Sequence, residues 1–181
     1  VAVPRVEGWS KKASAAGVAA PAQAFGIPLG GIFCMKHSPK GSTLASGGNG
    51  GVVRLWDDKG RLQRVFEGHT ARVASLAFSP DGKHLFSGSK DRSVRMVEAD
   101  TGKSKLTFSD REQDVLGVAV SSDGKSVVAT GMEPGLSWWN TETGAKLRSA
   151  GGHRGAVYEL AFSGDGKLLA SAGSDGTVRL W

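Results

Sequence analysis

The stretch Ser79-Pro80-Asp81-Gly82-Lys83 decides the fold, because it returns along the chain at a fixed interval. It recurs as SSDGK at 121–125 and as SGDGK at 163–167, and a weaker copy, SPKGS, occupies 38–42. The glycines of the four copies are 41, 42 and 42 residues apart, and two further series keep that spacing: Trp56, Val97, Trp139 and Trp181, and Ile32, Val73, Val115 and Val157. Three series with one period indicate four repeats of one structural unit.

Each repeat has the pattern of four short strands. In the second repeat, Val73–Phe78 is a run with alternating features that ends at the turn-forming Pro80-Asp81-Gly82. Further strands are predicted at 84–88, 94–97 and 103–108, with polar turns between them. No repeat has helical spacing over a useful length, so we expect under about a tenth of the residues to be helical. The units should form consecutive antiparallel sheets packed face to face.

A repeat of this length, with Gly-His near its start and Trp-Asp near its end, resembles the WD40 repeat. Gly68-His69 and Gly152-His153 carry the first signature, and Trp56-Asp57 carries the second. The resemblance covers residues 27–181. It implies an all-β fold, a β-propeller built of four-stranded antiparallel blades, of which about four are present as part of a larger propeller.

The repeats divide the chain into an arm and four blades. Residues 1–26 are rich in Ala and Gly and do not fit the repeat. The blades are expected at 27–67, 68–109, 110–151 and 152–181, the last of them incomplete. Closing the ring would require further blades or a partner, and Ala20–Phe25, one period before Arg61–Phe66, is a candidate outer strand.

The resemblance also implies a buried polar tetrad that links a His, a Ser or Thr, an Asp and a Trp within a blade. The fourth repeat matches at every position, with His153, Ser171, Asp175 and Trp181. The second has His69, Ser87 and Asp91, but Val97 replaces the Trp; the first keeps only Ser46 and Trp56. The third keeps Trp139, with Arg111, Ala129 and Glu133 at the other places. We therefore expect the third blade to depend on apolar packing and to be the least regular.

The sequence does not favour catalysis. His153, Ser171 and Asp175 are the residue types of a hydrolase triad, but an incomplete copy one period earlier favours an architectural role. Four scattered histidines and a single cysteine do not make a metal site. Gly47–Gly51 is followed by no Lys-Ser/Thr pair, as a phosphate-binding loop requires. We expect no catalytic residue, metal or cofactor, and we interpret Trp138 and Trp139 as packing residues.

The formal net charge is +6, with the excess in the first half of the chain. The loops of one propeller rim are expected to present Arg72, Lys90, Arg92, Arg111 and Arg154. A basic rim favours acidic protein surfaces, so the leading hypothesis is a non-catalytic scaffold for protein interaction in a multi-protein assembly. The alternative is binding of RNA or ribonucleoprotein, and an enzyme comes third. A single cysteine, Cys34, suggests a reducing, cytoplasmic setting with an organelle not excluded. No apolar stretch approaches the roughly 20 residues that span a bilayer.

Overall fold

The computed structural model describes residues 31–109 and 111–181, and strands dominate this part of the chain. Its one helical element is a short 3-10 turn, η1 (Asn49–Gly51). The expectations of an all-β fold and a small helical content are therefore confirmed. The arm at 1–26 and the candidate strand Ala20–Phe25 lie outside the described residues. The strands are β1 (Ile32–His37), β2 (Leu44–Gly48), β3 (Val53–Trp56), β4 (Leu62–Phe66), β5 (Val73–Phe78), β6 (His84–Ser89), β7 (Val94–Glu98), β8 (Ser104–Phe108), β9 (Val115–Val120), β10 (Ser126–Gly131), β11 (Gly135–Asn140), β12 (Lys146–Gly151), β13 (Val157–Phe162), β14 (Leu169–Gly173) and β15 (Val178–Leu180).

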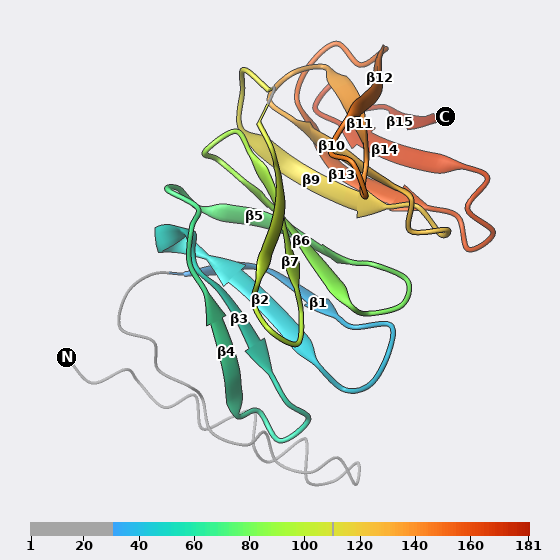
Figure 1. The fold of residues 1–181 in the computed structure, drawn as a ribbon. Helices are drawn as coiled ribbons and strands as arrows, with labels where there is room; N and C mark the ends of the chain where they lie inside the picture. Colours follow the sequence, from blue (N-terminus) through green and yellow to red (C-terminus); the bar gives the residue numbers. More distant parts are fainter. Residues whose placement is uncertain (1–30, 110) are drawn as a thin grey trace, which may run out of the picture.

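These strands form four antiparallel sheets, one for each repeat. Blade one is β1-β2-β3-β4, blade two β5-β6-β7-β8, blade three β9-β10-β11-β12, and blade four β13-β14-β15. The blades follow one another as a row in Figure 1, with blade one and blade four at its two ends. The first strands of neighbouring blades pack against each other, β1 on β5, β5 on β9 and β9 on β13. The predicted propeller architecture is thereby confirmed.

The hydrophobic core lies between the blades, because neighbouring sheets bury the faces that they turn toward each other. One cluster joins blades two and three, and its largest members are Phe86, Phe108 and Trp139. The rings of Phe108 and Trp139 are 5.7 Å apart between centroids. Trp138 belongs to the next cluster, between blades three and four. Both tryptophans are packing residues, and neither is an open ligand platform.

Glycine at the blade interfaces allows the sheets to approach closely. A Cβ added to Gly88 in β6 would lie 2.5 Å from Val118 Cγ2 and 2.6 Å from Val115 Cγ1, both in blade three. In the same way, a Cβ on Gly47 would lie 2.7 Å from Val73 Cγ1 in blade two. Side-chain atoms do not approach so closely, so the spacing of the first three blades depends on these glycines.

The recurring Ser-x-Asp-Gly-Lys stretch forms the turn between the first two strands of a blade. In blade two, Asp81 Oδ1 accepts a 2.6 Å hydrogen bond from Ser79 Oγ and a 3.0 Å bond from the Lys83 amide. Ser79 Oγ in turn accepts a 2.9 Å bond from the His84 amide. Gly82 has φ of 74°, a left-handed conformation that favours glycine. The motif recurs because each residue type satisfies one requirement of the turn.

Blade three differs from its sequence-based expectation. We expected the least regular blade, but its four strands form a complete sheet. Its ladder is irregular at Thr130/Gly131 and at Trp138/Trp139, and blade two has irregularities in the corresponding strand pairs. The expectation was wrong because it rested on missing signature residues, whereas a different set of polar side chains has taken their place.

Candidate functional site: the blade tetrads and the basic rim

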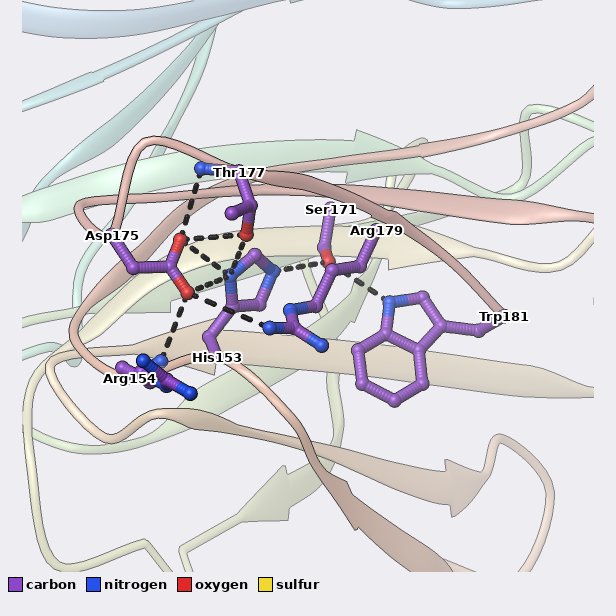
Figure 2. Close-up of polar contacts among 7 residues, drawn as sticks. All are labelled: His153, Arg154, Ser171, Asp175, Thr177, Arg179 and Trp181. Atoms are coloured by element: carbon purple, nitrogen blue, oxygen red, sulfur yellow. Dashed lines mark hydrogen bonds and ion pairs between the residues drawn. The ribbon is translucent and has the colours of Figure 1, made fainter.

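In blade four, four side chains from separate segments form one chain of hydrogen bonds (Figure 2). Trp181 Nε1 donates to Ser171 Oγ at 2.9 Å, and Ser171 Oγ lies 2.7 Å from His153 Nε2. His153 Nδ1 lies 3.0 Å from Asp175 Oδ1. Because the indole can only donate, the consistent assignment has the serine donating to Nε2 and the Nδ1–H donating to the carboxylate. The structure therefore brings all four expected residues together.

The carboxylate of Asp175 also accepts hydrogen bonds from two rim loops, the loop that enters the blade and the turn between β14 and β15. Its Oδ2 accepts a 2.9 Å bond from the Arg154 amide, and its Oδ1 accepts a 2.7 Å bond from the Thr177 hydroxyl. These hydrogen bonds, with that of His153, hold the pKa of Asp175 well below its ordinary value. Sequence reasoning missed Thr177 and its counterpart Ser93, although a hydroxyl residue two positions after the Asp is a visible signal.

Blade two has the same arrangement without the indole. His69 Nδ1 lies 2.8 Å from Asp91 Oδ2, and His69 Nε2 lies 2.8 Å from Ser87 Oγ. Ser93 Oγ donates a 2.6 Å bond to Asp91 Oδ1. Burial lowers the pKa of His69 against the opposing effect of Asp91, which favours the neutral imidazole in the folded protein. Val97, at the Trp position, packs against the apolar cluster that joins blades one and two.

The distances in these tetrads match those of a hydrolase triad, but their surroundings do not. Ser171 is only 1% exposed, and Trp181 Nε1 donates to the oxygen that would have to attack a substrate. The cavity beside His69 and Ser87 has a volume of about 20 Å³, room for about one water molecule. A nucleophile must be reached by its substrate, so the described geometry supports a structural role.

Blade three contains a different polar set at the same place. Arg111 stands at the repeat position of His69 and His153, and Ser137 at that of Arg95 and Arg179. The Arg111 Nη1 atom donates to Ser137 Oγ and to the Ala129 carbonyl, each at 3.3 Å. Its Nη2 atom lies 3.3 Å from Glu133 Oε2, much as Arg179 Nη2 lies 4.0 Å from Asp175 Oδ2 in blade four.

Glu133 takes the place of the absent aspartate as the acceptor of hydrogen bonds from the entering loop. Its Oε1 accepts bonds of 2.9 and 3.0 Å from the amides of Glu112 and Gln113, in the loop that enters the blade. Arg111 is 6% exposed. The expectation that Arg111 belongs to the exposed rim was therefore wrong, because its guanidinium is used inside the blade.

The other four expected rim cations belong to blades two and four. Arg72 and Lys90 lie on adjoining loops, joined by a 2.9 Å bond from the Lys90 amide to the Arg72 carbonyl. The Arg72 guanidinium stacks 4.1 Å above the Phe33 ring, and Lys90 Nζ lies 3.1 Å from Asp114 Oδ2. Arg92 and Arg154 are exposed. We call Arg72, Lys90 and Arg92 the blade-two patch. Arg154 belongs to blade four and is separated from this patch by blade three, whose entering loop exposes Glu112.

Arg92 has an unusual backbone conformation. Its φ is 71°, and it is the only residue other than glycine with a positive φ in the described part of the chain. The corresponding residues of blades one and four are Gly51 and Gly176, both with φ of 73°. A side chain at such a position costs on the order of 1 kcal/mol relative to glycine. An exposed arginine therefore occupies a place where the fold alone would favour glycine.

Within the described residues, the remaining chemical signals are few. No group of three or more His, Cys, Asp or Glu side chains is arranged to hold a metal ion. Cys34 is unpaired, and burial raises the pKa of its thiol to about 11. No described helix has the length and apolar character needed to cross a bilayer.

The row of antiparallel blades and the buried His-Ser-Asp networks define a β-propeller protein of the WD-repeat class. The chain belongs to the family described as WD domain, G-beta repeat, whose model matches residues 27–57, 60–97 and 144–181. The matched segments leave out β9, β10 and β11 of blade three and include its last strand, β12. In this blade Arg111 and Glu133 stand at the positions of the signature His and Asp, and the four-stranded sheet is still formed.

Two relatives and one solved structure illustrate the similarity. The chain is 36% identical over 72 residues to DDB1- and CUL4-associated factor 13 of Dictyostelium discoideum, covering 39% of this chain and 16% of that protein. It is 36% identical over 78 residues to pre-mRNA-processing factor 17 of Saccharomyces cerevisiae, covering 41% and 17%. The structure of U3-55K superposes with a TM-score of 0.80 at 28% identity, covering 87% of this chain and 50% of that one. The chain thus spans at most half the length of these proteins, and the two relatives are named as factors.

Proposed function

We propose that this protein is a non-catalytic scaffold that binds an acidic protein surface through the blade-two patch. Arg92 is the observation that carries the proposal. A residue held in a conformation that favours glycine, at an exposed position, suggests selection for its side chain and not for stability. Arginine is suited to this role because its planar guanidinium can bind a carboxylate with two parallel hydrogen bonds.

The buried network supports this role by fixing the loops that present the cations. Asp91 Oδ2 accepts a 3.0 Å bond from the Thr70 amide, and the Asp91 amide donates to Ser89 Oγ at 3.1 Å. The Arg92 amide donates to the Ser89 carbonyl at 3.1 Å. A rigid loop loses little conformational entropy on binding, which favours recognition without a large rearrangement.

Binding of RNA is the second candidate, and the contact of Arg72 with Phe33 favours it. Phe33 is 51% exposed, and an exposed ring beside an arginine is a platform on which a base can stack. The guanidinium already covers one face of that ring, however, and Phe33 is the only exposed aromatic ring described beside the patch. This is why we rank the acidic protein surface first.

Fluorescence anisotropy with two labelled probes distinguishes the candidates: an oligo-glutamate peptide and single-stranded oligo(U). We expect saturable binding of the peptide, weakened about tenfold by Arg72→Glu combined with Arg92→Glu. Arg92→Gly should also weaken binding while stabilising the fold by about 1 kcal/mol. The matched control is Lys125→Glu with Lys167→Glu, which makes the same change in charge at turns of the opposite rim. Tighter binding of oligo(U), with a steep salt dependence that the double variant removes, would favour the RNA candidate.

The compartment is a separate part of this proposal. The unpaired Cys34 supports a reducing setting. The similar proteins do not single out the cytoplasm, so the proposal is limited to a reducing compartment. Mass spectrometry of the protein isolated with its thiols blocked is the test, and a disulfide formed through Cys34 would contradict it.

A further inference from the structure

A groove of about 650 Å³ lies between blades two and three. Its walls are the turns β5–β6, β9–β10 and β11–β12, on the rim opposite the blade-two patch. Phe86, Met96 and Leu106 form an apolar floor. Phe86 and Met96 are otherwise buried in the cluster that joins the two blades, so the floor belongs to the rigid core of the molecule.

The walls of this groove are acidic. Asp81, Asp123 and Glu142 line it, and all three are exposed. The serine hydroxyl of each turn holds the pKa of Asp81 and of Asp123 below its ordinary value, which keeps both carboxylates ionised at neutral pH. Lys105 also lines the groove, but its Nζ lies 2.8 Å from Glu98 Oε1, outside the lining. The groove is therefore negative in a chain of net charge +6.

The neighbouring groove, between blades one and two, has a different character. It is smaller, about 370 Å³, and its charged lining includes Lys40, Arg64 and Lys83 beside Asp81 and Asp100. Lys40 stands at the repeat position of Asp81 and Asp123. Two grooves made by the same fold thus differ in charge through substitutions at equivalent positions. The acidic character belongs to this sequence and not to propeller geometry.

We propose that the acidic groove binds an extended segment of another protein in which Arg or Lys residues are next to aliphatic ones. The apolar floor accepts aliphatic side chains, and the carboxylates on two walls accept the cations. The volume is within the range of pockets that enclose a few side chains. Phosphates would be repelled by the same carboxylates, so a nucleic acid does not fit. This site is independent of the blade-two patch, and either can fail without the other.

The test uses two synthetic peptides with the full chain labelled with ¹⁵N. One peptide alternates Arg and Leu over six residues, and the second has Glu in place of each Arg. The Arg-Leu peptide should shift the amide resonances of Leu106, Asp123 and Glu142 in a saturable way, and the Glu-Leu peptide should not. Shifts that concentrate at the smaller groove, or no saturable binding at millimolar peptide, would overturn the proposal.

Two variants and a matched control separate the groove from a general charge effect. Glu142→Lys should weaken binding of the Arg-Leu peptide about fivefold or more, because an exposed cation–carboxylate contact is lost and replaced by repulsion. Asp123→Asn removes a charge but retains the oxygen that closes the turn, and it should weaken binding about threefold. Asp100→Lys is the control, since Asp100 stands at the repeat position of Glu142 but lines the other groove. Equal weakening by Asp100→Lys and Glu142→Lys would contradict a specific site.

Discussion

The guanidinium of Arg111 donates a 3.3 Å hydrogen bond to the hydroxyl of Ser137, and these two residues stand at the positions at which blades two and four have a histidine and an arginine, respectively. In blade four the cation near the carboxylate comes from β15, through Arg179; in blade three it comes from the entering loop, through Arg111. Both blades therefore have a cation beside the carboxylate that binds the entering loop, but a different segment supplies the cation in each. A blade therefore requires the interactions of its polar set and not the particular residues.

Replacing Arg111 by alanine should destabilise the protein by about 1–3 kcal/mol, because the Ala129 carbonyl and the Ser137 hydroxyl lose their donor. Glu133 remains partly exposed, which keeps the loss below that of a fully buried ion pair. Urea denaturation measures the free energy of unfolding. Arg154→Ala, at an exposed site, should change it by less than about 0.5 kcal/mol. Similar effects of the two substitutions would show that Arg111 contributes no more than a surface residue.

Ser171→Ala should lower the free energy of unfolding by about 1–3 kcal/mol, since it leaves Trp181 Nε1 without its acceptor and His153 Nε2 without its donor. Ser174→Ala, at an exposed site in the same blade, should have almost no effect. The Ser171→Ala and Ser174→Ala variants also test the rejected hydrolase role. A fluorophosphonate probe should not label the native protein, and labelling that Ser171→Ala abolishes would restore that role.

The thermal unfolding midpoint should fall as the solution is acidified from about pH 8 to about pH 5. The pKa of His69 is below its usual 6.5 in the folded protein, so the unfolded chain binds the proton first as the pH falls through 6.5. Stability is then lost on the acid side of 6.5. A second loss should follow below pH 3.8, where the unfolded chain protonates Asp175 and the folded one does not. His69→Gln should flatten the first step, and a midpoint that rises on acidification to about pH 5 would contradict the assignment.

Gly88→Ala should destabilise the protein by about 1–3 kcal/mol, because the new methyl group would overlap Val115 and Val118 of the next blade. Gly164→Ala is the matched control, since nothing lies within 4 Å of its added Cβ and its φ is not in the left-handed region. That change should be neutral or slightly stabilising. Equal destabilisation by both would mean that backbone effects, and not the contact between blades, determine the outcome.

The fold could be predicted from the sequence because the same turn motif and the same strand pattern recur in each repeat. The predicted strand Val73–Phe78 and its turn at Gly82 are found at the expected residues. The tetrads followed from the family resemblance. The Arg111 network did not, because Arg111 and Glu133 stand at the His and Asp positions of the repeat but are not the residue types that the resemblance assigns to a buried network. The acidic groove was also missed, since its lining comes from two blades and its charge depends on which turns are adjacent.

Because each blade packs mainly against its immediate neighbours, the described part of the molecule is a linear array of similar units. Copying one whole unit of about 42 residues would add a blade whose packing surfaces are similar to those that neighbouring blades already contact. Duplication of a gene segment is therefore a route by which a repeat protein of this kind gains a blade. Blade number is thus a property that recombination can change in a single event, whereas the interior of a conventional domain would have to be redesigned.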